Sequence, residues 1–229
     1  MDSPLSRHRF SRALCAVLAL PWVLASCGPD QTGYVSPVCD GSFFALSGLS
    51  PPVPVDFVQL RQVRTNLDGD SSTEVVLNSS GTACATASDK AACESALSTL
   101  SSRSGFRSRC NEQVCYARYL VTTRGDEVVA HTSLEALKGF LGPIDTAQEA
   151  VLVASASYED LSCRDMPRGA VRPNEGGGFT VIGHLKGFCL EVTQFVLDVS
   201  VSGEVKELRR YVLEPAWGQC QASAGASEG

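Results

Sequence analysis

Cysteine is the residue type with the widest chemistry in this chain, which has 229 residues, ten cysteines and only three histidines. A thiol can be acylated, form a disulfide, bind a metal ion or act as a nucleophile. Ten cysteines are too many for a reducing cytosol unless they hold metal or do catalysis, and too few for a small scaffold in which bridges replace the core. The count therefore indicates an oxidising compartment and a chain with a hydrophobic core of its own.

The N-terminal segment is typical of an exported protein. Three arginines, Arg7, Arg9 and Arg12, precede residues 13–25 (ALCAVLALPWVLA), which carry no charge. This pattern matches the n-region and h-region of a secretory signal peptide. The apolar run is shorter than the roughly 20 residues that span a bilayer, so we expect a cleaved signal rather than a membrane helix.

The tetrapeptide LASC at 24–27 ends the apolar run and resembles the lipobox of bacterial lipoproteins. The resemblance implies that residues 1–26 are removed as a lipoprotein signal peptide and that Cys27 is acylated. Two or more acyl chains anchor a protein stably where one is marginal. The residue directly after Cys27 is Gly28 and not an aspartate. In lipoproteins that this segment resembles, this implies sorting to the cell outer membrane. The sequence does not define whether the protein lies on the periplasmic or the outer face of that membrane.

Cysteine parity separates this interpretation from ordinary cleavage after Ala25, which would release a soluble secreted protein. Loss of the signal removes Cys15 and leaves nine cysteines, an odd number, whereas lipidation of Cys27 leaves eight that can pair. The eight disulfide candidates are Cys39, Cys84, Cys93, Cys110, Cys115, Cys163, Cys189 and Cys220.

Eight cysteines allow 105 connectivities, and sequence alone does not choose among them. Proximity favours Cys84–Cys93 and Cys110–Cys115 as local bridges, which would leave Cys163–Cys189 and Cys39–Cys220 as the other two. The competing idea is a zinc site made by the middle four cysteines, but no Cys-x-x-Cys pair occurs and export favours disulfides. We therefore expect no metal site and no cofactor.

The mature chain is expected to form one folded domain on a tether. Residues 27–54, rich in glycine and proline, predict the tether, residues 55–220 the domain, and residues 221–229 a flexible tail. Loss of three arginines and one aspartate with the signal changes the formal net charge from −6 to −8. This acidic balance argues against nucleic-acid binding.

Turn signals between apolar runs predict antiparallel hairpins. The three hairpins pair 55–64 with 73–77, 114–122 with 127–131, and 192–201 with 205–213. Further strands are expected at 150–156 and 179–185, and two short helices at 88–101 and between a capping box at 132–135 and Gly142. The prediction is a strand-rich α+β domain of antiparallel hairpins with two short helices, stapled by disulfides.

Several motifs have a structural interpretation that is stronger than the functional one. The tripeptide Arg-Gly-Asp at 124–126 matches a cell-adhesion motif, but a glycine with polar neighbours is also typical of a tight hairpin turn. An acidic run from Asp68 to Glu74 resembles the start of a calcium loop but lacks its later ligands. His131 and His184 lie among apolar residues and are expected to be structural, so no residue is assigned as catalytic.

Residues 119–150 (YLVTTRGDEVVAHTSLEALKGFLGPIDTAQEA) and 177–183 (GGFTVIG) resemble a group of cysteine-rich lipoproteins of gliding bacteria. The resemblance assigns no activity.

We expect a lipid-anchored cell-envelope lipoprotein, not an enzyme, with a binding, scaffolding or assembly role. Its partners would be the membrane, through the lipid, and envelope proteins. The alternatives are a component of a cell-surface motility or adhesion system and a lipid-anchored hydrolase, which clustered histidines and carboxylates would favour.

Overall fold

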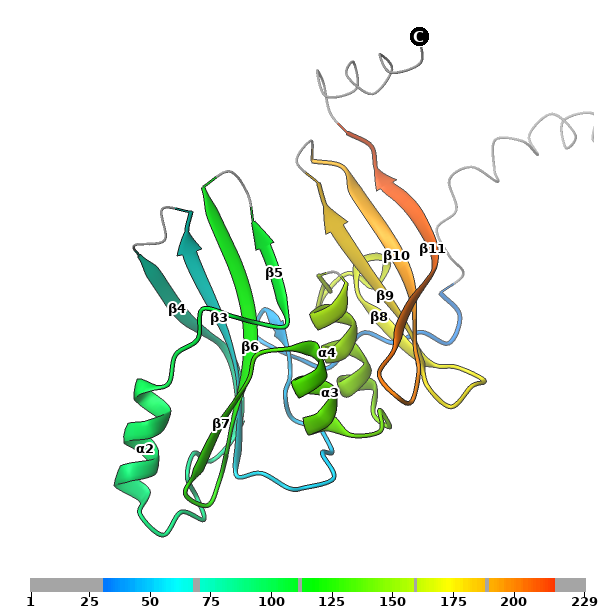
Figure 1. The fold of residues 1–229 in the computed structure, drawn as a ribbon. Coiled ribbons are helices and arrows are strands. Elements are labelled where there is room, and N and C mark those ends of the chain that lie inside the picture. Colours follow the sequence, from blue (N-terminus) through cyan, green and yellow to red (C-terminus); the bar gives the residue numbers. More distant parts are fainter. Residues whose placement is uncertain (1–30, 68–70, 111–112, 159, 188–189, 217–229) are drawn as a thin grey trace, which may run out of the picture. The chain divides into compact units, whose positions relative to one another are not determined.

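The structure is a computed structural model that describes residues 31–67, 71–110, 113–158, 160–187 and 190–216 (Figure 1). The chain divides into two compact units, Met1–Thr32 and Gly33–Gly229. Cys27, Cys189 and Cys220 lie outside the described residues, as do Asp68 and Asp70 of the acidic run and the tail from residue 217. The account below concerns the second unit.

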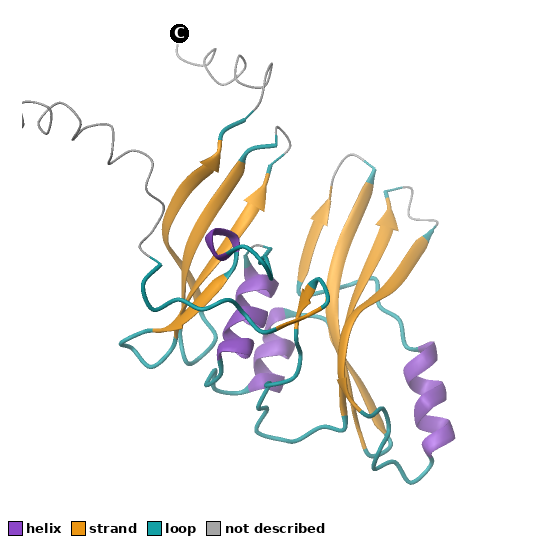
Figure 2. Cartoon of the chain, turned by 180° about the vertical axis from the view of Figure 1, so that it is seen from behind, coloured by secondary structure: helices purple, strands orange, loops and turns teal. Residues whose placement is uncertain are grey.

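The described part of this unit is a strand-rich α+β fold whose sheets are antiparallel, as the sequence predicts (Figure 2). Its first large sheet has the strand order β4-β3-β6-β5, with β7 also paired to β6. The strands of this sheet are β3 (Phe57–Asn66), β4 (Ser72–Gly81), β5 (Arg107–Cys110), β6 (Val114–Arg124) and β7 (Glu127–His131).

A second sheet has the order β11-β10-β9-β8. Its strands are β8 (Ala170–Pro173), β9 (Phe179–Lys186), β10 (Val192–Val199) and β11 (Val205–Glu214), and a short 3₁₀ helix, η1 (Met166–Arg168), precedes β8. All three predicted hairpins are confirmed as β3–β4, β6–β7 and β10–β11. Gly203 has φ 74° in the last hairpin turn, a conformation that favours glycine.

The Gly/Pro-rich residues 27–54 are predicted to be a tether, but from Gly33 onward they are part of the fold. This segment forms the small hairpin of β1 (Cys39–Asp40) and β2 (Phe43–Phe44), and it buries Phe44 and Leu46 in the main core. Gln148 fixes this segment by donating to the carbonyl oxygens of Val38 at 3.0 Å and Ala45 at 2.7 Å. Composition alone did not show that its few apolar residues are buried.

Three α-helices are present among the described residues, one more than predicted. Helix α2 (Lys90–Thr99) begins after Asp89, whose side chain accepts a hydrogen bond from Ala92 N. Helix α3 (Leu134–Leu141) ends at Gly142, as expected. Its N-cap is Ser133 rather than the Thr132 of the predicted capping box.

The third helix, α4 (Ala147–Ser157), corrects the strand predicted at 150–156. A capping box opens it, since Thr146 accepts from Glu149 N and the Glu149 carboxylate accepts from Thr146 N at 3.1 Å. Residues 148–156 are all buried. A helix buried on every side lacks the polar face that marks helical periodicity, so its apolar run looks like a buried strand.

Three disulfides are present among the described cysteines. The local bridges Cys84–Cys93 and Cys110–Cys115 are confirmed. Cys39, however, pairs with Cys163, with 5.8 Å between their Cα atoms. The predicted Cys163–Cys189 and Cys39–Cys220 pairings are therefore wrong. The folding of the N-terminal segment brings Cys39 to the loop after α4, which proximity in sequence does not reveal.

Candidate functional site

One face of the first sheet changes character along its length. Leu60 of β3 lies opposite Leu120 of β6, and both belong to the main core together with residues of α3 and α4. Two residues further along the same strands, the paired positions are Gln62 and Arg118, and Arg107 of β5 lies opposite Arg118 on its other side. Because alternate residues of a strand share a face, the apolar surface gives way to a polar row.

The next row on this face is also basic. Arg64, Tyr116 and Arg109 lie side by side across β3, β6 and β5. The two rows border a cavity of about 280 Å³. Its lining residues, here called the arginine pocket, are Gln62, Arg107, Arg109, Tyr116, Arg118 and Asp160.

Asp160 faces the three arginines of the pocket from the loop after α4. Its Oδ1 lies 3.3 Å from Arg118 Nη1 and 3.8 Å from Arg107 Nη1, and its Oδ2 lies 3.8 Å from Arg109 Nη1. Only the first of these distances allows a hydrogen bond. Three guanidinium groups thus meet one carboxylate, and the side chain of Asp160 is 42% exposed.

Backbone carbonyls hold two of these arginines in place. Arg109 donates to the Lys186 carbonyl oxygen at 3.1 Å and Arg107 to the Ser155 carbonyl oxygen at 3.4 Å. Asp160 is held in turn by its own backbone, whose carbonyl oxygen accepts from His184 N at 2.8 Å. The pocket is therefore positioned by the first sheet, by the end of α4 and by β9 of the second sheet.

The side chains of this pocket are suited to recognition of an anion rather than to proton transfer. A guanidinium group donates hydrogen bonds in a planar fork and keeps its proton at all physiological pH values. Forks of this kind match the oxygens of carboxylates and phosphates. The chain as a whole is acidic, with a formal net charge of −6. The basic lining of the pocket therefore differs from the charge of the whole chain.

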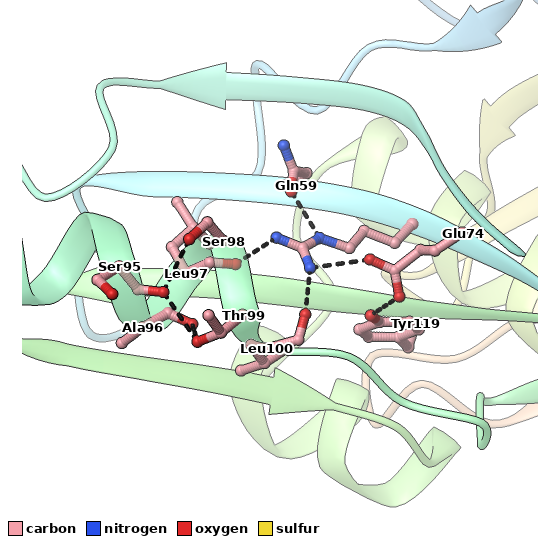
Figure 3. Close-up of polar contacts among 10 residues, drawn as sticks. Gln59, Glu74, Ser95, Ala96, Leu97, Ser98, Thr99, Leu100 and Tyr119 are labelled. Atoms are coloured by element: carbon pink, nitrogen blue, oxygen red, sulfur yellow. Dashed lines mark hydrogen bonds and ion pairs between the residues drawn. The ribbon is translucent and has the colours of Figure 1, made fainter.

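Arg61 has a structural role on the opposite face of β3, since it directly precedes Gln62 on that strand. Figure 3 shows its surroundings, among them Glu74, Leu97 and Leu100. Its guanidinium group donates to the carbonyl oxygens of Leu97 at 2.9 Å and Leu100 at 2.7 Å, at the end of α2. It also pairs with Glu74 at 2.9 Å, and Glu74 accepts a hydrogen bond from the Tyr119 hydroxyl. The group is buried and its contacts are internal, so we do not assign it to a binding site.

His131 and His184, the histidines among the described residues, lie on strands of different sheets. His131 of β7 shares a 3.0 Å hydrogen bond with the Thr122 hydroxyl and packs on the Phe140 ring, and burial lowers its pKa. His184 of β9 hydrogen-bonds the Arg168 carbonyl oxygen through Nδ1 at 3.0 Å. Each histidine has structural partners, and the described contacts do not bring the two together.

The Arg-Gly-Asp turn is occupied by contacts within the domain. Arg124 pairs with Glu127 at 3.0 Å, and Gly125 N donates to Asp56 Oδ2 at 3.1 Å. The Asp126 carboxylate accepts from the Ser88 hydroxyl at 2.5 Å and from Asp89 N at 3.0 Å. These hydrogen bonds lower the pKa of Asp126. The tripeptide therefore ties the β6–β7 turn to the start of α2.

Two further observations concern metal ions and membranes. Glu74, the last residue of the acidic run that resembles a calcium loop, is used by Arg61 and Tyr119. No group of metal-ligating side chains occurs within the described ranges. None of the helices in that part of the chain has the length and hydrophobicity needed to cross a bilayer.

The sequence contains a signal for the arginine pocket that the predictions above do not include. Arginines alternate in Arg107-Ser108-Arg109, and Tyr116 and Arg118 show the same spacing, which places each pair on one face of a strand. The signal was lost because the segment of β5 was not predicted to be a strand.

The chain was compared with known proteins by sequence and by fold. No protein-family model matches it, and neither a curated protein nor a solved structure matches it significantly. The function of the arginine pocket is therefore inferred from its own geometry and charge.

Proposed function

We propose that this chain is an exported, lipid-anchored protein of the bacterial cell envelope whose folded domain holds an anionic group of a partner, without catalysing a reaction. Its role would be binding, scaffolding or assembly at the outer membrane. The observation that carries the binding part is the convergence of Arg107, Arg109 and Arg118 on the single carboxylate of Asp160.

The anchoring part of the proposal depends on Cys27, at the end of the uncharged run 13–25. Support comes from the disulfides of the domain, because structural disulfides persist in oxidising compartments such as the periplasm and the cell surface. Six of the eight cysteines that would remain after lipidation form bridges in the described part of the chain. Acylation of Cys27 would leave the remaining two, Cys189 and Cys220, for a fourth bridge.

The non-catalytic part is favoured by the donor set of the pocket. Arginine guanidinium groups bind and orient oxyanions but do not exchange protons. The described nitrogen bases, His131 and His184, are each engaged with structural partners. A role in binding an oxyanion accounts for the three arginines of the pocket, Arg107, Arg109 and Arg118.

The experiment is expression of Cys27→Ala beside Cys15→Ala, a matched variant that removes a cysteine from the segment discarded with the signal. The wild-type protein and Cys15→Ala should label with a radioactive fatty acid and partition into a detergent phase. Cys27→Ala should do neither. Unchanged detergent partitioning and labelling of Cys27→Ala would overturn the anchoring proposal.

A further inference from the structure

We propose that the arginine pocket is a receptor for a phosphate group in its doubly charged form, either free phosphate or the monoester of a larger partner. This inference gives a ligand class to the binding role proposed above and rests on that role. It follows from three features of the described residues: their charge, the distances around Asp160 and the size of the cavity.

The charge of the lining favours a dianion. Arg107, Arg109 and Arg118 carry three positive charges and Asp160 carries one negative charge, which leaves a surplus of two among these lining residues. A phosphate monoester has a charge of about −1.5 to −2 at pH 7 and three strong acceptor oxygens. It would therefore neutralise the surplus while each arginine faces an oxygen. Glu159, which precedes Asp160, lies outside the described residues and is not part of this count.

The distances show that Asp160 does not replace such a ligand. Charge-assisted hydrogen bonds between nitrogen and oxygen are about 2.7–2.9 Å long. The three Arg–Asp160 distances are 3.3, 3.8 and 3.8 Å. The carboxylate thus acts as a counter-ion that limits repulsion among the arginines, and the cavity that they line is the space for an oxyanion.

The size of the cavity favours one group rather than a whole small molecule. Its volume of about 280 Å³ is at the lower limit of the roughly 300–1,000 Å³ typical of ligand pockets. The half-buried Tyr116 lies opposite Arg109 and adds an aromatic side chain to the lining. The pocket therefore fits a phosphate together with the first atoms of what carries it.

The test is calorimetric titration of the full mature protein, purified with its lipid in detergent micelles. The probes are inorganic phosphate, glucose 1-phosphate and dimethyl phosphate, the last of which keeps the tetrahedral shape but has only one charge. Phosphate and glucose 1-phosphate should bind saturably and dimethyl phosphate much more weakly. Tighter binding of glucose 1-phosphate would identify a partner-borne monoester as the ligand, and equal binding would identify the phosphate group itself.

Variants link any binding to the pocket. Arg118→Gln should weaken phosphate binding by about tenfold or more, because a charged hydrogen-bond donor is lost. Arg164→Gln, which removes the same charge at an exposed position outside the lining, should change it by less than about twofold. Asp160→Asn should strengthen binding severalfold, because it removes the competing carboxylate but keeps a side chain of the same shape. A purely structural role for the Asp160 ion pairs predicts no such gain.

Acidification gives an independent check of the double charge. The second pKa of a phosphate monoester is about 6, so lowering the pH from about 8 to about 5 should weaken its binding by about tenfold. The charged and titratable groups that face the pocket are Arg107, Arg109, Arg118, Asp160, Tyr116 and, on β9, His184. Sulfate keeps both of its charges over this range, so its titration reports any contribution of the protein separately.

Three results would overturn the proposal. These are the absence of saturable phosphate binding at low millimolar concentrations, equal losses in Arg118→Gln and Arg164→Gln, and equal affinity for dimethyl phosphate and phosphate. Circular dichroism of each variant shows whether the fold is intact. Since phosphate binding is measured on lipid-bearing protein, a negative result leaves the anchor proposal standing, and failure of anchoring would be seen in the Cys27 variants instead.

Discussion

Arg61 on strand β3 donates a 2.9 Å hydrogen bond to the backbone carbonyl oxygen of Leu97 in helix α2. The last carbonyls of a helix have no partner within the helix and lie at the negative end of its dipole. Helix α2 has no basic residue in its last turn. A residue 36 positions earlier in the chain therefore provides the positive charge that this end of the helix requires.

Replacement of Arg61 by methionine should destabilise the domain by about 3 kcal/mol, because breaking one partner of a buried ion pair leaves the other uncompensated. The lost contacts are those with Leu97, Leu100 and Glu74. Arg61→Lys should recover only part of the loss, since an ammonium group cannot make the same fork. The free energy of unfolding in urea measures the effect. The control is Arg64→Met at an exposed position of the same strand, which should lower that free energy by less than about 0.5 kcal/mol. Equal costs at both positions would refute this assignment.

Tyr119 should make the stability fall at high pH. Burial, together with its hydrogen bond to Glu74, raises the pKa of the Tyr119 phenol to about 12, whereas an unfolded tyrosine ionises near about 10. Between these values the unfolded chain releases a proton that the native protein retains, so the free energy of unfolding decreases as pH rises. An ultraviolet titration should show a phenol ionising near the upper value that is missing from Tyr119→Phe. Identical titration curves would contradict the assignment.

The long-range bridge should stabilise the domain more than a local one. Cys39 and Cys163 are 124 positions apart, whereas Cys84 and Cys93 are 9 apart. Loop-closure entropy assigns about 5 kcal/mol to the first bridge and about 2.5 kcal/mol to the second. Thermal unfolding of the two double serine variants compares them. A larger loss for Cys84/Cys93 would mean that chain entropy does not govern these bridges.

Asp126 should contribute stability that depends on its ionised form. Hydrogen bonds from Ser88 and Asp89 lower its pKa below the ordinary value of 3.8. The contribution is therefore present above that value and is lost as the pH falls through the lower, folded pKa. Asp126→Asn should lower the melting temperature at neutral pH and converge with the wild type in acid. Asp40→Asn controls for the loss of one negative charge, and a pH-independent difference for Asp126→Asn would contradict the mechanism.

The elements that the sequence predicts well are those with local signals. The turn glycines Gly125 and Gly203 and the alternating runs beside them identify two hairpins. Ser88 and Asp89 are both candidate caps of α2 in the sequence, and the structure has Asp89 as the N-cap. Helix α4 was predicted to be a strand because complete burial removes the periodicity on which such a prediction depends.

The features that the sequence did not predict depend on contacts between distant segments. Cys39 reaches Cys163 only because the N-terminal segment packs on α4 through Gln148. The arginine pocket likewise needs β5 beside β6 and Asp160 placed by the end of α4. The alternation of Arg107 and Arg109 places both on one face of a strand, but local sequence does not show which distant segments meet that face.

The most direct test of the central proposal is the intact mass of the mature protein isolated from its own membrane without reduction. We predict a chain that begins at Cys27, carries acyl groups and has eight fewer hydrogens than the reduced form. The three observed bridges leave Cys189 and Cys220 for the fourth. A chain that begins at Ser26 without lipid, or that contains free thiols, would contradict this account.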